Sequence, residues 1–131
     1  MHELVLIIDD DPISILVSET IIRKHHFSQE IKSFKSARDG IAFLKEHLAE
    51  GHKLPGVIFL DVMMPIMDGW EFLDAYEEII DKSDFEPNVI MLTALTGDKD
   101  REKARAHPLV KTFVSKPITS DFLRSLAKGD A

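Results

Sequence analysis

The chain has 131 residues, a size typical of one domain, and its 44% hydrophobic and 30% charged content is typical of a folded globular protein. The net charge of −7 argues against a nucleic-acid-binding surface, which needs clustered positive charge. The absence of cysteine excludes disulfide scaffolds, thiol nucleophiles and cysteine-ligated zinc. The longest apolar run, residues 4–8, is too short for a membrane span or a signal peptide, so we expect one cytoplasmic domain over residues 1–131.

Short apolar runs alternate with longer amphipathic segments along the chain. The runs at residues 4–8, 57–60 and 89–92 are typical of strands covered on both faces, and 31–34 and 112–114 are weaker candidates. Helical spacing of apolar or charged residues marks the segments between them. The expected helices cover 37–49, 70–80, 98–105 and 121–127, and a first helix begins at Pro12.

This order of elements predicts an α/β fold. Five strands alternating with five helices form parallel βαβ units with right-handed crossovers, which gives a doubly wound five-stranded parallel sheet in a three-layer sandwich. Ligands of such sheets bind beyond the carboxyl ends of the strands. The residues that follow each strand are therefore the candidates for function.

Charged or hydroxyl side chains follow four of the five expected strands. They are Asp9 and Asp10, Asp61, Thr93 and Lys116. Carboxylates crowded together repel one another unless a cation neutralises them, and hard oxygen ligands in this number suit Mg²⁺. A metal, a lysine and a hydroxyl together stabilise charge on a transferring phosphoryl group, and an aspartate there can be the nucleophile that forms an acyl phosphate.

Four short motifs carry these residues in order. They are Asp9-Asp10, the stretch Ile-Phe-Leu-Asp-Val-Met-Met-Pro-Ile-Met-Asp-Gly over residues 58–69, Thr93-Ala94, and Lys116-Pro117. In this combination, over essentially the whole chain, the sequence resembles a response-regulator receiver domain of two-component signalling, of the chemotaxis-regulator type. The resemblance implies a flavodoxin-like (βα)5 fold. It also implies a signalling domain that is not an enzyme beyond a weak autophosphatase activity.

The resemblance implies how the phosphoryl group would be handled. Asp61 would accept it, Lys116 would pair with Asp61 and then with the phosphoryl oxygens, and the Lys116–Pro117 bond would be cis. Thr93 would hydrogen-bond the phosphoryl group, and Phe113 would be the aromatic residue whose burial changes with it. Because Phe113 has no hydroxyl, we expect this switch to depend on packing alone.

The resemblance also implies a cofactor, Mg²⁺. Asp10 and Asp61 would bind the ion through their carboxylates, Asp9 through a water molecule, and Met63 through its backbone carbonyl. Gly69 fits a tight junction between a loop and a helix, where the backbone must pass closely.

The implied partner is a sensor histidine kinase or a histidine phosphotransfer protein. It would dock on the first helix and on the loop after the fifth strand, at Ser14, Ile15, Ser18, Pro117 and Ile118. A downstream protein target, or a second copy of the chain, would bind the face of the fourth helix, fifth strand and fifth helix. We expect no nucleic-acid or membrane partner.

Two alternatives remain open. A phosphohydrolase of the haloacid-dehalogenase type would use Asp9, but Ile13 stands where that motif usually has Thr or Val, and no acidic pair follows a later strand. A receiver-like module that binds proteins without being phosphorylated is disfavoured by the intact set of strand-end residues. The six histidines are expected to be solvated, without a metal-binding or catalytic role.

Overall fold

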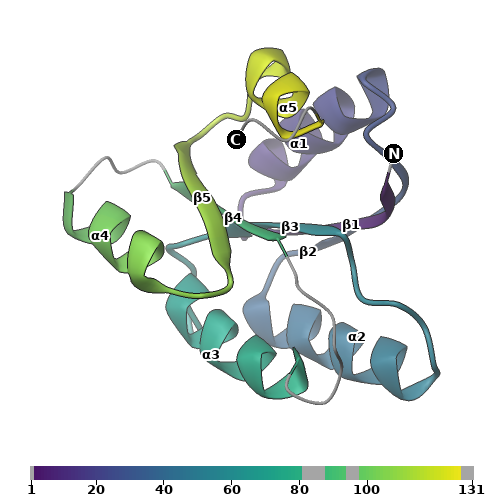
Figure 1. The fold of residues 1–131 in the computed structure, drawn as a ribbon, viewed down its shortest axis with the longest axis vertical. Helices are drawn as coiled ribbons and strands as arrows, with labels where there is room; N and C mark the ends of the chain where they lie inside the picture. Colours follow the sequence, from purple (N-terminus) through teal and green to yellow (C-terminus); the bar gives the residue numbers. More distant parts are fainter. Residues whose placement is uncertain (1, 81–87, 94–97, 128–131) are drawn as a thin grey trace.

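The structure, a computed structural model, describes residues 2–80, 88–93 and 98–127. Strands and helices alternate within them, as the sequence predicts (Figure 1). The strands are β1 (His2–Ile8), β2 (Ser28–Phe34), β3 (Val57–Asp61), β4 (Asn88–Thr93) and β5 (Val110–Ser115). The helices are α1 (Pro12–Lys24), α2 (Ala37–Ala49), α3 (Gly69–Ile80), α4 (Asp98–Ala106) and α5 (Ser120–Ala127).

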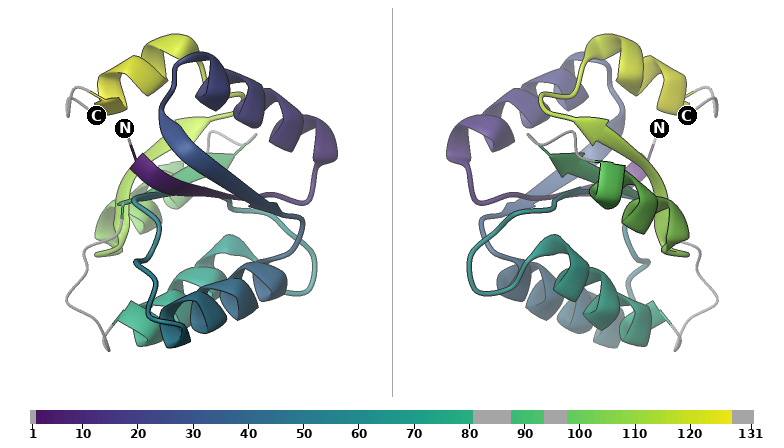
Figure 2. Two further views of the ribbon diagram at one scale, coloured as in Figure 1. Left: turned by 90° about the vertical axis from the view of Figure 1, so that its right-hand side faces the viewer. Right: turned by 90° about the vertical axis from the view of Figure 1, so that its left-hand side faces the viewer.

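The five strands form one parallel sheet in the order β2-β1-β3-β4-β5. Because β1 has β2 on one side and β3 on the other, the winding reverses at β1, and this reversal defines the ligand-binding edge of such sheets. Helices α1 and α5 cover one face of the sheet, and α2, α3 and α4 cover the other (Figures 1 and 2). The expected doubly wound three-layer sandwich is confirmed. None of the described helices is both long and apolar enough to cross a bilayer.

Successive side chains of β1 pack into two different cores. Leu6 and Ile8 belong to the cluster under α2 and α3, whereas Val5 and Ile7 belong to the cluster under α1 and α5. A strand covered on both faces must be apolar at every position, which explains the unbroken run in the sequence. The edge strands β2 and β5 are only partly buried, so their apolar runs are shorter.

The two helices that follow β1 and β3 begin at well-defined caps. The Asp11 side chain accepts a hydrogen bond from the Ile13 amide at 3.0 Å, and Pro12 occupies the first turn of α1. Before α3, the Glu71 amide donates to Asp68 Oδ1 at 2.9 Å and the Asp68 amide donates to Glu71 Oε1 at 3.2 Å. This reciprocal capping box fixes where α3 starts.

Tyr76 of α3 offers a test of the packing beneath the sheet. Its side chain is fully buried, burial raises its pKa above the ordinary value, and its hydroxyl has no hydrogen-bond partner in the described part of the chain. An unpaired buried polar group costs about 1–3 kcal/mol, so Tyr76→Phe should raise the free energy of unfolding by about 1 kcal/mol in urea denaturation. Tyr76→Leu, which leaves a void, should lower it. A less stable phenylalanine variant would contradict this assignment.

Candidate functional site

The strand register places two aspartates side by side at the carboxyl edge of the sheet. Ile8 of β1 is aligned with Leu60 of β3, so the next residues, Asp9 and Asp61, lie at the ends of adjacent strands. Their exposed fractions are 1% and 5%. Buried like charges this close repel each other, so the site needs a positive group nearby.

Lys116, which follows β5, supplies that positive group. Its Nζ lies 2.7 Å from Asp9 Oδ2 and 3.1 Å from Asp61 Oδ2. Burial opposes the charged form of Lys116, but the hydrogen bonds and charges of the two carboxylates outweigh it and raise its pKa above the ordinary value. The ammonium therefore bridges both aspartates, and the shorter contact is to Asp9 rather than to Asp61, the only partner that the sequence suggested.

The Asp9 carboxylate is held on both of its oxygens. Oδ1 accepts a hydrogen bond from the Asp11 amide at 3.0 Å, and Oδ2 accepts one from Ser14 Oγ at 2.6 Å besides its contact with Lys116. Hydrogen bonds to an ionised carboxylate are short and strong, so these donors fix the orientation of Asp9. Ser14 of α1 is thus a positioning residue of the site.

The Asp61 carboxyl is less completely compensated. Burial and the neighbouring Asp9 charge raise its pKa to about 6, while Lys116 and the Met63 amide, 3.4 Å from Oδ1, act in the opposite direction. Near neutral pH Asp61 is mainly ionised in a site that disfavours its charge. A carboxylate in that condition gains from a cation or from a covalent partner that redistributes its charge.

Asp10 completes an acidic cluster with Asp9 and Asp61. One carboxylate oxygen from each lies within 4.8 Å of the others, and Asp10 is exposed while the other two are buried. Three hard oxygen donors beside open solvent fit Mg²⁺, which binds one or two carboxylates and keeps several waters. The donor set therefore agrees with the cofactor expected from the sequence. Met63 has an exposed side chain, and its amide faces Asp61.

Gly69 sits where the backbone of α3 meets the backbone of β3. Its amide donates to the Val62 carbonyl at 2.9 Å. A Cβ atom at position 69 would lie 2.6 Å from the Asp61 carbonyl oxygen. Only glycine allows this approach, in agreement with the tight junction expected from the sequence.

The two expected switch residues are only partly covered by the described structure. The register aligns Thr93 of β4 with Ser115 of β5, so the Thr93 backbone is one strand position from Lys116, but its side chain lies outside the described residues. Phe113 of β5 is half-buried and packs against the core beneath α3. It also lines a cavity of about 240 Å³ beside α4.

Three of the five residues expected to contact a partner need a correction. Ile15, Ser18 and Ile118 are buried, with exposed fractions of 8%, 3% and 1%. The spacing of apolar residues in α1 is compatible with more than one helix face packing on the sheet. In the structure, Ile15 and Ile22 pack in the core on that face of the sheet. The large apolar residues exposed near the site are instead Ile13, Leu16, Met63 and Ile66.

The expectation that all six histidines are solvated is also wrong in part. The His107 side chain is only 16% exposed and faces Asp74 and Glu77, and His25 Nε2 is buried. No local pattern in the sequence brings residues 74, 77 and 107 together, because the contact joins two distant segments.

The geometry gives no support to the hydrolase alternative. That reaction would need Asp9 as a nucleophile with a free oxygen facing the substrate. Asp9 is almost fully buried, and each of its oxygens already accepts from a protein donor.

The raised pKa of Asp61 leads to a prediction about the free energy of unfolding of the metal-free protein. The folded state binds this proton more tightly than the unfolded state, so ionisation of Asp61 lowers stability as the pH rises through about 6. With a chelator at about pH 7.5, Asp61→Asn should raise the free energy of unfolding by on the order of 1–3 kcal/mol, and the gain should shrink towards about pH 5. Urea denaturation measures this. The exposed control Asp39→Asn should show no gain, and an equal gain at both pH values would contradict the assignment.

Comparisons with known proteins agree with this fold. The sequence matches the family described as "Response regulator receiver domain" over residues 5–128. It is 34% identical over 99 residues to the heme response regulator HssR of Staphylococcus saprophyticus, covering 76% of this chain but 38% of that relative.

Two solved structures illustrate the structural likeness. A two-component response regulator from Cytophaga hutchinsonii is 34% identical, with a TM-score of 0.89 and coverage of 98% of this chain and 96% of that one. The receiver domain of the histidine kinase CKI1 from Arabidopsis thaliana, crystallised with Mg²⁺ and BeF₃⁻, shares the fold at 19% identity and a TM-score of 0.79, covering 96% and 90% of the two chains. The chain belongs to the response regulator receiver domain family of two-component signalling.

Proposed function

We propose that Asp61 accepts a phosphoryl group from the phosphohistidine of a sensor histidine kinase or a histidine phosphotransfer protein. An Asp61 oxygen forms a bond to phosphorus while the bond from phosphorus to the donor's imidazole nitrogen breaks, and the electron pair stays on that nitrogen. The observation that carries this proposal is the buried Asp61 carboxylate, with a pKa of about 6, within 3.1 Å of an ammonium group. Such a carboxylate is ionised at neutral pH and already faces a group that stabilises phosphoryl oxygens.

The other residues of the site would bind the Mg²⁺ ion and keep Lys116 and Asp9 in position. Lys116 remains anchored on Asp9 while it faces the incoming phosphoryl oxygens, and Ser14 keeps Asp9 in place. Asp10, Asp61 and the Met63 carbonyl would bind Mg²⁺, with Asp9 acting through a water molecule. When bound, the ion neutralises negative charge on the carboxylates and on the phosphoryl oxygens. The CKI1 receiver domain crystallised with Mg²⁺ and BeF₃⁻ supports this choice of cofactor by its shared fold.

Phosphorylation of Asp61 would change the protein surface through movements of Thr93 and Phe113. A phosphoryl group adds close to two negative charges and three acceptor oxygens at Asp61, and the Thr93 hydroxyl and Lys116 can turn towards them. Phe113, half-buried and without a hydroxyl, would shift further inward as Thr93 moves. The face of α4, β5 and α5 would then bind a downstream protein or a second copy of the chain.

Intact mass after incubation with a small phosphodonor and Mg²⁺ tests the acceptor. Wild type should gain one phosphoryl mass, while Asp61→Asn and chelator-treated protein should gain none at a comparable rate. Asp68→Asn makes the same chemical change at the start of α3 and should still be labelled. Labelling of Asp61→Asn at the native rate would overturn the proposal, and turnover without a labelled intermediate would favour a hydrolase.

The exposed apolar residues beside the site are the proposed contact for the phosphodonor protein. Ile13 and Leu16 lie at the start of α1, Met63 and Ile66 lie in the loop after Asp61, and their exposed fractions are 72%, 61%, 60% and 86%. Apolar side chains this exposed around a reactive group are typical of a protein interface.

Substitution of Leu16 tests this contact. Leu16→Glu should slow phosphoryl transfer from a phosphorylated histidine phosphotransfer protein by about tenfold or more, while labelling by a small phosphodonor stays unchanged. Ala42→Glu adds the same charge on an exposed position of α2 and should change neither rate. Equal transfer rates for Leu16→Glu and Ala42→Glu would show that the partner docks elsewhere.

A further inference from the structure

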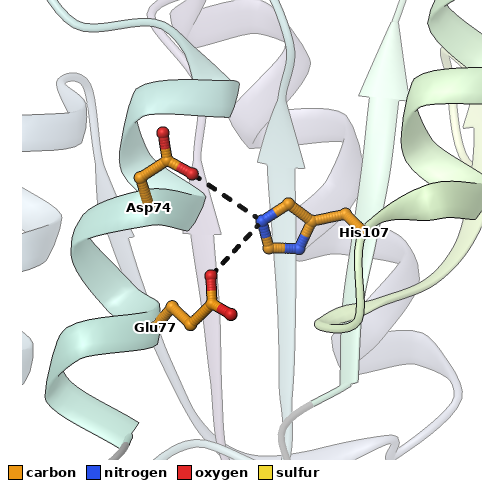
Figure 3. Close-up of side chains that lie close together, drawn as sticks. All are labelled: Asp74, Glu77 and His107. Carbon is orange, nitrogen blue, oxygen red and sulfur yellow. Dashed lines mark ion pairs between the residues drawn. The ribbon is translucent and has the colours of Figure 1, made fainter.

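A second cluster of metal-ligating side chains lies away from Asp61. Asp74 and Glu77 are one turn apart on α3, and His107 lies in the turn between α4 and β5 (Figure 3). Because His107 precedes β5 and Lys116 follows it, this cluster is at the opposite end of that strand from the acidic site.

The three side chains converge on one point, and the two carboxylates form long ion-pair contacts with His107 (Figure 3). His107 Nε2 lies 3.9 Å from Asp74 Oδ1 and 3.9 Å from Glu77 Oε2, and the three ligand atoms are all within 4.8 Å of one another. These separations exceed a hydrogen bond. An ion at the nearest equidistant point would lie about 2.1–2.5 Å from each atom, close to the bond lengths of Zn²⁺ with imidazole nitrogen and carboxylate oxygen.

The surroundings of the cluster allow an ion to enter and to be neutralised. The His107 side chain is 16% exposed, whereas Glu77 and Asp74 are 45% and 79% exposed and open to solvent. The exposed carboxylates can therefore close the remaining few tenths of an ångström. Two carboxylates balance the charge of one divalent cation, and water can complete the coordination.

The His107 ring presents Nε2 to the two carboxylates, but its tautomer must change before Nε2 binds a metal. The Leu109 amide donates to its Nδ1 at 3.2 Å, so Nε2 faces the two carboxylates. In this arrangement Nε2 carries the ring proton. Metal binding moves that proton to Nδ1 and releases the Leu109 amide, so the ring stays neutral and one hydrogen bond is exchanged for a metal bond.

We propose that Asp74, Glu77 and His107 form a binding site for a divalent transition-metal ion, with Zn²⁺ as the best match. A donor set of one imidazole and two carboxylates suits zinc, whereas the all-oxygen set of Asp9, Asp10 and Asp61 suits Mg²⁺. The bound ion links α3 to the turn between α4 and β5. This inference does not depend on phosphorylation of Asp61.

The only tryptophan of the chain provides a reporter for this site. Trp70 lies on α3, and Lys103 Nζ of α4 is 4.7 Å from the centre of its ring, so a change between α3 and α4 alters its surroundings. Zn²⁺ is titrated into the full chain in the presence of saturating Mg²⁺, with tryptophan fluorescence and calorimetry as readouts. The NMR signals of the His107 ring and of the Leu109 amide follow the same titration.

We expect one Zn²⁺ to bind per chain, with shifts of the His107 ring nitrogens and the Leu109 amide. His107→Gln, Asp74→Asn and Glu77→Gln should each weaken binding about tenfold or more, and the last two leave the Leu109 hydrogen bond intact. His52→Gln, on the exposed loop before β3, should bind Zn²⁺ as wild type does, and all variants should retain the wild-type circular dichroism spectrum.

Equal Zn²⁺ affinity of His107→Gln and wild type, or a His107 ring whose NMR signals do not respond to Zn²⁺, would overturn the proposal. Labelling of Asp61 by a phosphodonor should persist in His107→Gln, so the two proposals fail separately.

Discussion

The site depends on one interaction, the contact of the Lys116 ammonium with two buried carboxylates. Asp9 and Asp61 lie at the ends of adjacent strands because of the register between β1 and β3. Without a positive group between them, this register would bury two like charges at the carboxyl edge of the sheet. Lys116 approaches from β5, two strands away from β3, so the compensation requires the whole strand order and not only the central pair.

The same contact explains a division of tasks between the two aspartates. Asp9 accepts hydrogen bonds on both oxygens and is fixed, whereas Asp61 has a weaker set of donors and a pKa raised to about 6. Two chemically identical side chains thus acquire different properties from their surroundings. Burying a carboxylate in this way costs stability, a common condition of residues that serve reactivity more than folding.

Much of the fold could be predicted from the sequence because the hydrophobic patterns of its strands and of its helices are both local features of the sequence. β1 and β3 are covered on both faces and appear as unbroken apolar runs, and strand-end residues at the same sheet edge must come together once the strands are parallel. The depth to which α1 is buried could not be predicted. Its apolar residues allow more than one orientation on the sheet, and Ile15, which was expected at the partner-facing surface, lies inside. The surroundings of His107 depend on a contact between α3 and the end of α4, which leaves no periodic signal in the sequence.

The close approach at Gly69 has a mechanical consequence. The first residue of α3 touches the carbonyl of Asp61 and bonds to the next carbonyl along the chain, and the capping box of Asp68 and Glu71 stiffens the start of the helix. The Asp61 backbone and the first turn of α3 are therefore mechanically linked. A displacement of the Asp61 backbone has to be shared with the start of α3, the helix that also carries Asp74 and Glu77.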